Sequence, residues 1–304
     1  MKRRILSPAS TSNLGPGFDA LGLAVGWGIA VTIEPECPAG FSVILEGEGK
    51  EILPPDGRNM IIKVAREIAG DAADRAAWSI RSEIPVARGL GSSAAARCAG
   101  LAAGHLLVNG NLPPRHLIFE EASRHENHPD NASACVFGGM RVCAREGRDW
   151  RNWPGLIADE GAELLLVIPD VPVATSLARS ILPTTYTRSA SVQTLQGLSV
   201  LLSGLARGDW DAVRIGCNDH LHEPYRLPMV PGLGEALTAL RADPNLGGAW
   251  LSGAGPTLAA FAPTDSASRD SGKESVELLE KAGTGAKLHR VAIDRTGLRL
   301  EETQ

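Results

Sequence analysis

The chain has 304 residues, of which 43% are hydrophobic and 21% are charged, and its formal net charge is -5. This length suits two domains or one large two-layer domain, with enough apolar residues for a sizeable core. Basic residues are interleaved with acidic ones, which argues against a protein that binds duplex nucleic acid. The sequence also lacks an apolar run long enough to predict a membrane span.

The start of the chain is basic, but residues 5–10 do not continue as the apolar stretch of about 7–15 residues that a signal peptide requires. We therefore expect a cytoplasmic protein. The chain contains five cysteines, an odd number without metal-ligand spacing, and disulfides are rare in the cytosol. We expect these cysteines to be reduced thiols that are mostly buried.

Several short apolar segments have the composition of β-strands; they are residues 5–6, 28–33, 41–45, 78–82, 139–143, 163–168, 248–251, 257–261 and 288–293. Longer segments with the periodicity of helices are residues 60–69, 94–108, 115–123, 191–205, 210–217, 233–241 and 273–281. Strands and helices do not alternate strictly, which favours an α+β fold over a doubly wound parallel sheet. Turn-forming residues at 150–155 predict a boundary between domains that span residues 1–155 and 156–304.

The most informative segment is residues 85–95, where a glycine-rich turn follows a predicted strand and leads into an alanine-rich helix. Glycine lets the backbone approach a ligand closely, and the first turn of a helix presents free N–H groups at the positive end of its dipole. This pattern predicts a phosphate site, with the hydroxyl of Ser92 or Ser93 within reach of a phosphate-bound magnesium ion. The segment lacks the lysine of a Walker A loop.

Residues 89–94 also match the Gly-x-Gly-x-x-Ala form of the dinucleotide-binding fingerprint. A dinucleotide-binding unit needs a second strand that ends in Asp or Glu about 20 residues further on. Here the predicted helix runs instead into the loop 109–114 and then into another helix. The dinucleotide interpretation is therefore disfavoured, while a glycine-rich helix start without a ligand is an alternative for this segment taken alone.

Two further glycine-rich segments lie far from this one in the chain. Residues 8–24 are expected to form a polar loop that offers hydroxyls, an amide and a carboxylate. Residues 251–257 lie between two apolar strands, and their Gly-Ala-Gly-Pro sequence is unusual for a hairpin. Glycine costs ordering entropy and proline cannot donate to a strand ladder, so a close backbone contact with a ligand would explain this loop.

Together and in this order, the three glycine-rich segments resemble the motifs of the GHMP kinase superfamily. Within it, further stretches are similar to the homoserine kinase family: the Pro-Ala-Ser-Thr start at 8–19, His-Pro-Asp-Asn at 128–131 with Phe-Gly-Gly at 137–139, residues 175–183, and Leu-His-Glu-Pro-Tyr-Arg at 221–226 with Pro-Gly at 231–232. The resemblance extends over about residues 8–261. The chain departs from the family at residues 132–135, where the usual Val-Ala-Pro-Ala is Ala-Ser-Ala-Cys.

The resemblance implies a two-domain α+β fold whose N-terminal, ATP-binding domain carries a left-handed βαβ element like that of ribosomal protein S5 domain 2. A C-terminal α+β domain of ferredoxin-like type packs against it, with the active site between the two. The implied activity is transfer of the γ-phosphate of ATP, with Mg²⁺, to the hydroxyl of L-homoserine, which gives O-phospho-L-homoserine for threonine biosynthesis. A homodimer is expected by analogy, and neither nucleic acid nor membrane is expected as a partner.

The resemblance also implies roles for individual residues. ATP contacts are implied for Asn59, Pro85, Val86, Ala87, Arg88, Gly89, Leu90, Gly91, Ser92, Ser93, Ala94 and Ala95. Magnesium ligands are implied to be Ser92 or Ser93 with one glutamate, either Glu120 or Glu126. Contacts with the substrate are implied for Asn13, Asp19, His128, Asn131, Thr175, Arg179, Arg226, Gly253 and Gly255.

Catalysis is expected to depend on Asn131, Ser93 and Arg179. Relatives such as mevalonate kinase carry an aspartate at the position of Asn131, and an amide cannot usefully accept a proton, so Asn131 is expected to orient the attacking hydroxyl. Phosphoryl transfer through a loose transition state depends mainly on positioning and charge stabilisation, so it does not require a strong base. The substrate carboxylate calls for planar bidentate donors, which Arg179 and Arg226 would supply.

Three alternatives stay open at this stage. The chain could be a kinase of threonine or another hydroxy amino acid, because one pocket contact discriminates between such substrates by only about 1–3 kcal/mol. It could be a sensor that binds ATP or an amino acid without catalysis. It could also be a metallohydrolase, since His125, His128 and Asp130 lie at short spacing, although that site would need further ligands.

Overall fold

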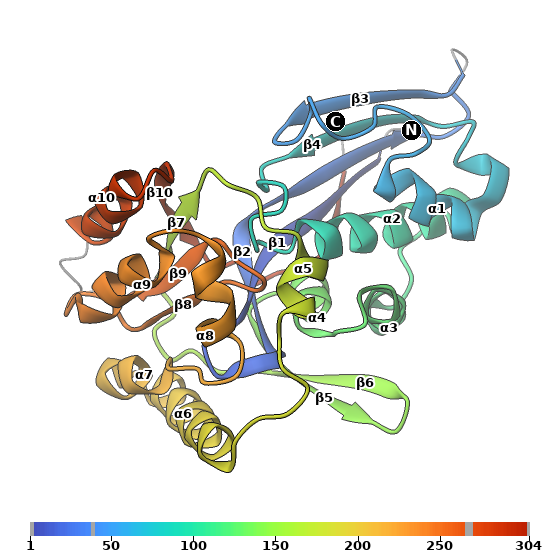
Figure 1. The fold of residues 1–304 in the computed structure, drawn as a ribbon. Coiled ribbons are helices and arrows are strands. Elements are labelled where there is room, and N and C mark those ends of the chain that lie inside the picture. Colours follow the sequence, from blue (N-terminus) through green and yellow to red (C-terminus); the bar gives the residue numbers. More distant parts are fainter. Residues whose placement is uncertain (1–2, 38–39, 265–269, 303–304) are drawn as a thin grey trace.

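The structure is a computed structural model, and it describes residues 3–37, 40–264 and 270–302. Two β-sheets with helices packed on them make up the molecule, the larger one on the right of Figure 1 and the smaller one on the left. Strands and helices are mixed along the chain without strict alternation. The α+β architecture expected from the sequence is confirmed.

The larger sheet contains the strands of the first half of the chain and the last strand. These strands are β1 (Arg3–Asn13), β2 (Gly17–Glu34), β3 (Ser42–Gly47), β4 (Ala77–Ser82), β5 (Met140–Glu146), β6 (Asp149–Pro154) and β11 (Arg299–Glu302). Their order is β11-β1-β2-β4-β3, and β2 also pairs with β5, which pairs with β6. Strands β3 and β4 are parallel and are connected through α1 (Met60–Ala69) and η1 (Gly70–Ala72), which gives a βαβ unit.

Helices α2 (Ser92–Asn109), α3 (Arg115–Glu126) and α4 (Asp130–Phe137) lie beside this sheet (Figure 1). Helices α2 and α4 contact β1 and β2 directly. Ile5, Val31 and Ile80 form one register row across β1, β2 and β4, and all three are buried in the same core as the alanines of α2. The small side chains of α2 therefore bring the first turn of this helix close to β1.

Helix α2 also packs closely on α1, because glycine occupies two contact positions. A Cβ atom at Gly100 would lie 2.7 Å from the Ile61 carbonyl oxygen, and one at Gly104 would lie 2.8 Å from that of Ala65. A larger side chain at either position would push the helices apart. This contact fixes Asn59, the residue that precedes α1, relative to the first turn of α2.

The smaller sheet has the order β10-β7-β9-β8, and its strands are β7 (Glu163–Pro169), β8 (Ala249–Leu251), β9 (Leu258–Ala262) and β10 (Ala286–Ala292). All of its pairs are antiparallel. The alternating side chains of β7 divide between two cores: Leu164 and Leu166 join the core shared with the larger sheet, while Leu165 and Val167 pack with α9 (Leu233–Ala242). The remaining helices of this half are α5 (Thr175–Ser180), α6 (Arg188–Arg207), α7 (Trp210–Gly216), α8 (Glu223–Arg226), η2 (Leu227–Met229) and α10 (Lys273–Lys281).

The expectation of a loop over residues 8–24 is wrong. Most of this segment belongs to β1 and β2, which pair from Ala9↔Val25 to Ser12↔Gly22 and leave a turn at 14–16. The segment looks like a loop because its serines and threonine are polar. Those side chains are nevertheless buried, since they hydrogen-bond across the chain to residues more than 100 positions away.

The turn-rich segment at 150–155, expected to be a boundary, is mostly strand β6, which pairs with β5 as a hairpin. The last strand, β11, pairs with β1 in the larger sheet. The division into domains 1–155 and 156–304 thus stays a prediction. The sequence also failed to indicate the short helices α4, α5 and α8, whose few turns give too little periodicity.

The five cysteines are free, and all except Cys37 are buried, as expected. Within the part of the chain that the structure describes, no helix combines the length and the apolar character that crossing a membrane requires.

Candidate active site

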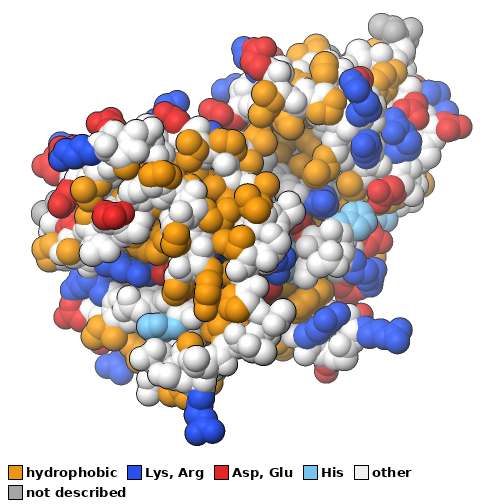
Figure 2. Space-filling view, in the orientation of Figure 1, with side chains coloured by type: hydrophobic (Ala, Val, Ile, Leu, Met, Phe, Trp, Pro, Cys, Tyr) orange, Lys and Arg blue, Asp and Glu red, His pale blue; other side chains and the backbone are white. Residues whose placement is uncertain are grey.

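A cavity of about 310 Å³ lies between the two halves of the molecule. Its lining comes from β1, the turn before α2 and the start of α4 on one side, and from α5, α8 and the loop after β8 on the other. Figure 2 shows the face on which the molecule is hollowed between these halves, with hydrophobic side chains along the hollow. Such concave sites between domains are where ligands usually bind.

The glycine-rich turn before α2 is held tightly between the two halves. Ala87, Gly89 and Gly91 all have positive φ angles, of 55°, 74° and 67°. A Cβ atom at Gly89 would lie 2.3 Å from the Ser252 carbonyl oxygen, and one at Gly91 would lie 2.0 Å from Oγ of Ser10. Only glycine fits such approaches, and the close contact seen is between this turn and the 251–257 loop. The expected contact of this loop with a ligand stays a prediction.

Helix α2 then begins at Ser92, with Gly91 as its N-cap and without a side-chain capping bond. The first N–H groups of such a helix, together with its dipole, favour an anion. Arg88 does not add to this site directly, because its guanidinium donates to the carbonyl oxygens of Pro169 and Asp170, at 2.9 and 2.6 Å. It ties the turn to the end of β7.

Asn59 lines the same cavity as this turn and has two local partners. Its Oδ1 accepts from the Ile61 backbone N–H at 3.1 Å and its Nδ2 donates to the Pro54 carbonyl oxygen at 3.2 Å. The side chain therefore caps α1 and holds the segment before it. It also lines the cavity, in the region where the sequence predicts the nucleotide base.

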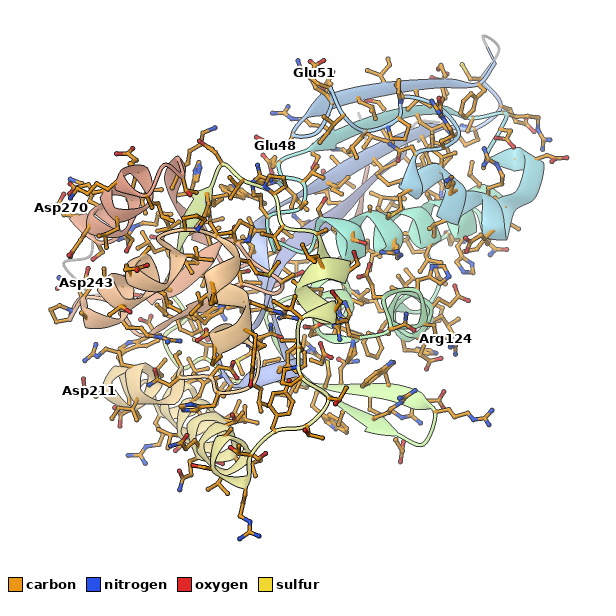
Figure 3. All side chains as sticks on the ribbon, in the orientation of Figure 1. Glu48, Glu51, Arg124, Asp211, Asp243 and Asp270 are labelled. Carbon is orange, nitrogen blue, oxygen red and sulfur yellow. The ribbon has the colours of Figure 1, made fainter. Side chains whose placement is uncertain are left out.

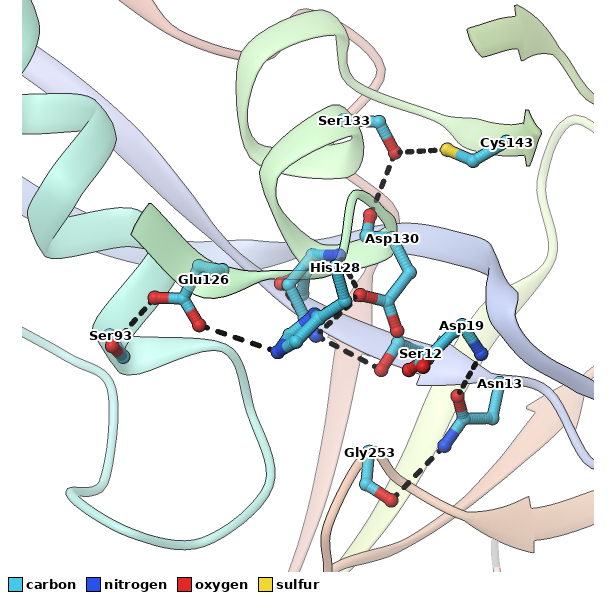
Figure 4. A network of polar contacts seen from close by, with 12 residues as sticks. Ser12, Asn13, Asp19, Ser93, Glu126, His128, Asp130, Ser133, Cys143 and Gly253 are labelled. Carbon is cyan, nitrogen blue, oxygen red and sulfur yellow. Dashed lines mark hydrogen bonds and ion pairs between the residues drawn. The ribbon is translucent and has the colours of Figure 1, made fainter. Parts of the chain in front are cut away.

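Ser93 and Glu126 both line the cavity, and Figure 4 shows the contact between their side chains. Oγ of Ser93 donates to Oε1 of Glu126 at 2.7 Å, and Oε2 of Glu126 lies 3.5 Å from Nε2 of His128. A hydroxyl and a carboxylate are hard oxygen donors of the kind that Mg²⁺ prefers, so these two groups fit the ion. Ser92 also lines the cavity.

The other candidate magnesium ligand, Glu120, lies elsewhere. Its carboxylate is 3.6 Å from Nη2 of Arg124, one turn further along α3. Figure 3 labels Arg124 beside α3, and neither Arg124 nor Glu120 is among the residues that line the cavity. The structure thus brings Glu126 and not Glu120 to the serines.

Asn131 is fixed by two serines of β1. Its Oδ1 accepts from Oγ of Ser10 at 2.9 Å, and its Nδ2 donates to Oγ of Ser12 at 3.1 Å. The two serines are two residues apart on a strand, so both face the same side. Asn131 also lies beside the phosphate turn, because a Cβ atom at Gly91 would be 3.1 Å from its Oδ1. The amide is therefore held rigidly next to the start of α2.

His128 and Asp130 form a buried pair beside Asn131, with Nδ1 of the histidine 2.6 Å from Oδ1 of the aspartate. Burial alone would raise the pKa of Asp130, but the charge and hydrogen bond of His128, with hydrogen bonds from the Asn131 backbone and Ser12, together lower that pKa. Burial likewise lowers the pKa of His128, but the charge of Asp130, its hydrogen bond and the charge of Glu126 together raise it. The pair favours an imidazolium between carboxylates.

Asp19 and Arg179 form a bidentate ion pair across the cavity, with both N···O distances at 2.9 Å. Asp19 has a positive φ angle of 54°, and its backbone N–H donates to Oδ1 of Asn13. Nδ2 of Asn13 in turn donates to the Gly253 carbonyl oxygen at 3.1 Å. Asn13 thus joins the turn after β1 to the loop after β8.

Arg226 is buried beside this pair. Its Nε donates to the Ala178 carbonyl oxygen and its Nη1 to that of Gly253, both at 3.0 Å. Burial, with the nearby charge of Arg179, lowers the pKa of Arg226 to about 10. Both guanidinium groups lie over the ring of Phe18, at 5.7 Å for Arg179 and 5.2 Å for Arg226. Both arginine side chains therefore lie over the same aromatic ring.

Of the residues expected at the site, most line one cavity, and four do not. Thr175 and Gly253 are part of the lining, together with the residues discussed above. Pro85, Ala95, Glu120 and Gly255 are not among the lining residues. Ala95 is fully buried in the core, and Gly255 lies against Gly89, whose Cβ would be 2.9 Å from its backbone nitrogen. The trio expected for a metal site, His125, His128 and Asp130, does not come together. His125 lies 3.5 Å from Glu67, and the one group of possible metal ligands found within the described residues is Asp19, His128 and Asp130.

The sequence reasoning missed Ser10, Ser12, Phe18 and Arg97. The two serines could have been found from their alternation had the segment been treated as a strand. Arg97 follows Ser93 by four residues on a predicted helix, so helical spacing would have placed it at the same face. Phe18 gave no signal, because nothing local shows which distant arginines will cover its ring.

Two family models match this chain. Residues 59–139 match the family model for the GHMP kinases N terminal domain, and residues 201–274 match that for the GHMP kinases C terminal domain. These matches cover the turn before α2 with Asn131 in the first half, and Arg226 with the 251–257 loop in the second. The fold is that of a GHMP kinase.

Individual relatives show to which family of GHMP kinases the chain belongs. The chain is 33% identical to a homoserine kinase of Deinococcus radiodurans over 99% of this chain and 97% of that protein. It is 38% identical to one of Solibacter usitatus over 84% of this chain and 83% of the other. A crystal structure of homoserine kinase from Cytophaga hutchinsonii has the same fold, with a TM-score of 0.81 at 23% identity over 99% and 97% of the two chains. The chain belongs to the homoserine kinase family.

Proposed function

We propose that this chain transfers the γ-phosphate of ATP to the hydroxyl of L-homoserine, with Mg²⁺, and releases ADP and O-phospho-L-homoserine. Family membership supports an ATP-dependent kinase that acts on a hydroxyl group. The observation that carries the choice of substrate is the cluster of Asp19, Arg179 and Arg226 around Phe18, at the end of the cavity away from α1. These groups suit a small zwitterion.

The cluster offers both charges that an amino acid needs. Arg226 is buried with two of its nitrogens fixed on backbone carbonyls, so its guanidinium has a set direction. A fixed planar guanidinium suits a carboxylate, and the Asp19 carboxylate suits an ammonium group. In the structure Asp19 and Arg179 form an ion pair with each other. A zwitterion that binds between them would replace this ion pair with two others, one between its ammonium group and Asp19 and one between its carboxylate and Arg179. The backbone of the substrate is held in this way and its side chain is left to extend.

The side chain of the bound amino acid would extend towards Asn131. The amide lies between the charged cluster and the start of α2, and Ser10 and Ser12 hold its orientation. It can therefore hydrogen-bond the hydroxyl and aim its oxygen at the γ-phosphorus in line with the bond that breaks. Because the transition state is loose, this positioning, together with the helix N-terminus that stabilises the phosphate charge, supplies most of the acceleration.

Ser93 and Glu126 would hold the magnesium ion, which supplies charge stabilisation to the phosphate oxygens. Glu126 is kept in place by contacts from Ser93 and His128, and Asp130 holds the histidine. In the row formed by Glu126, His128 and Asp130, the histidine lies between two carboxylates, so an imidazolium there would balance the charge of the ligand carboxylate. Ser92 is the alternative hydroxyl ligand, since it lines the same part of the cavity.

We also propose that the ATP-binding domain comprises residues 1–155 and the second domain residues 156–304, that the reaction takes place in the cytoplasm, and that a homodimer is the working form. The free thiols support the choice of a reducing compartment. Sedimentation equilibrium would test the dimer, and a single species at the monomer mass would contradict it.

A coupled ADP-release assay tests the activity, with Mg·ATP and L-homoserine, L-threonine, L-serine or mevalonate as acceptor. We expect turnover with homoserine to exceed that with every other acceptor by at least tenfold. Preferred turnover of threonine or serine would keep the phosphate site but replace the substrate. Nucleotide binding without transfer to any acceptor would instead indicate a sensor and contradict the proposal.

A further inference from the structure

Arg97 occupies the place where the magnesium ligands meet. It lies on α2 one turn after Ser93, so both side chains project from the same face of the helix. Its Nη1 contacts both Oγ of Ser93 and Oε1 of Glu126. Oε1 is also the oxygen that accepts the hydrogen bond from Ser93. A guanidinium cation thus already lies on both groups proposed to hold the metal.

This ion pair differs from those on the surface of the molecule. The side chain of Glu126 is 10% exposed and that of Arg97 is 22% exposed, whereas Arg124, in its pair with Glu120, is 62% exposed. Water screens the attraction in an exposed pair but does so much less in a buried one. The free enzyme therefore neutralises a poorly hydrated carboxylate with its own arginine.

Magnesium and the Arg97 guanidinium cannot hold the same oxygens together. A divalent ion on Ser93 and Glu126 would bring two positive charges to the atoms that the guanidinium contacts, in a partly buried region where like charges repel strongly. The long, flexible arginine side chain has solvent on one side, so it can withdraw along α2. The phosphates of a bound nucleotide would lie at the N-terminus of the same helix and add the negative charge that attracts the metal.

We propose that Arg97 is a resident cation that competes with the metal for Glu126 and Ser93. It neutralises the Glu126 carboxylate in the free enzyme and leaves this carboxylate only when nucleotide phosphates bind. The metal therefore binds together with ATP and not before it. This inference rests on the magnesium site proposed above. It predicts a low affinity for divalent ions in the absence of nucleotide, and an increase in that affinity when the positive charge is removed.

The test measures the binding of Mn²⁺, as a probe for Mg²⁺, by electron paramagnetic resonance of the free ion, using the full chain without nucleotide. Arg97→Met keeps the apolar stem and removes the charge, and we expect it to bind Mn²⁺ at least tenfold more tightly than the unmodified chain. Arg97→Gln carries the same expectation should the methionine variant fold poorly. Arg97→Lys keeps the charge and should stay within about threefold of the unmodified chain.

Arg124→Met is the matched control, because it removes an arginine from a glutamate pair outside the cavity, and its Mn²⁺ affinity should be unchanged. With a non-hydrolysable ATP analogue present, the affinities of the unmodified chain and Arg97→Met should converge. Equal or weaker Mn²⁺ binding by both Arg97→Met and Arg97→Gln without nucleotide would overturn the role of Arg97.

A further variant separates this inference from the site on which it rests. Glu126→Gln in the Arg97→Met background should abolish the gain in Mn²⁺ affinity. Should the gain persist without the Glu126 carboxylate, the metal lies elsewhere, and the magnesium assignment falls together with the role of Arg97. Loss of the gain, with normal thermal unfolding, supports both.

Discussion

The two ends of the cavity, which we assign to the ATP phosphates and to the substrate, are built from different kinds of group. The phosphate end is built from backbone: a turn with three positive φ angles and the first N–H groups of α2. The substrate end is built from charged side chains, with Asp19, Arg179 and Arg226 held around Phe18. Backbone ligands can be disturbed only by moving the chain, whereas side-chain ligands can be removed one at a time. The two ends should therefore respond to mutation in different ways.

The largest effect is expected at the phosphate end. Gly89→Ala places a Cβ atom 2.3 Å from the backbone oxygen of Ser252, at a φ of 74°. The turn must shift, and a shift of about 1 Å in a reacting group costs roughly 100-fold in rate. We expect kcat/KM to fall about 100-fold for ATP and for homoserine alike in steady-state kinetics.

Gly110→Ala is the control for this prediction. Gly110 ends the same helix with a similar φ of 70°, but no heavy atom lies within 4 Å of the position that its Cβ would take. It should reduce stability slightly and leave kcat/KM within about twofold. Similar losses of activity in both variants would show that backbone strain, and not displacement of the turn, is responsible.

A substitution at the substrate end should weaken the binding of homoserine and leave the binding of ATP unchanged. Arg226→Met removes a buried guanidinium that is tied to two carbonyl oxygens. Hydrogen bonds to charged groups contribute about 1.5–3 kcal/mol, so we expect KM for homoserine to rise about 30-fold while KM for ATP changes little. Arg214→Met, at an arginine that also donates to backbone carbonyls but lies on α7, should leave both constants unchanged. Equal changes in both KM values at Arg226 would contradict a substrate-specific role.

The residue between the two ends should affect turnover instead of binding. Asn131→Ala removes the amide that Ser10 and Ser12 orient, and we expect kcat to fall at least about tenfold, or about 1.4 kcal/mol. Ser10→Ala and Ser12→Ala each remove one of the two orienting bonds and should lose less. An unchanged kcat in Asn131→Ala would exclude this residue from the mechanism.

The smallest effect concerns the pH dependence of stability. The pKa of His128 is raised above its ordinary 6.5 because the attraction of Asp130 and Glu126 outweighs burial. A raised pKa stabilises the folded protein fully below the unfolded value of 6.5, and this contribution is lost as the pH rises through the folded pKa. Each unit of pKa difference corresponds to about 1.4 kcal/mol.

His128→Gln therefore should reduce the free energy of unfolding more at pH 6 than at pH 9, as measured by urea denaturation of both proteins. Asp130, whose pKa is lowered from 3.8, stays ionised across this range and does not contribute to the change. A loss that is the same at both pH values, or larger at pH 9, would show that His128 is not held as an imidazolium.

The turn and helix start that we assign to the phosphates could be predicted from the sequence far better than the cluster of charged side chains that we assign to the substrate. Glycines before an alanine-rich helix are a local pattern, and the helix begins at Ser92, next to where the spacing placed it. Arg226 and Asp19, in contrast, lie 207 positions apart in the chain, and they could be connected only through resemblance to a family. Local patterns do not show which of many arginines will be buried over one phenylalanine ring.

The same limit explains the error over residues 8–24. Its serines resemble those of loops, because a polar side chain in a strand is expected to face water. Here Ser10 and Ser12 face inward to an amide more than 100 residues away, and that partner cannot be seen locally. The choice between Glu120 and Glu126 was open for a related reason, since both lie on one helix and only the packing of α3 against α2 separates them.

The most direct test of this account removes one charge at a time from the substrate. L-homoserine would be compared with 4-hydroxybutyrate, which lacks the ammonium group, and with 3-amino-1-propanol, which lacks the carboxylate, in the ADP-release assay. Because we assign the ammonium group to Asp19 and the carboxylate to the arginines, we predict that kcat/KM falls at least about 100-fold with each analogue, or about 2.7 kcal/mol per lost charge. Turnover of either analogue at a rate close to that of homoserine would contradict the assignment of the charged cluster to substrate recognition.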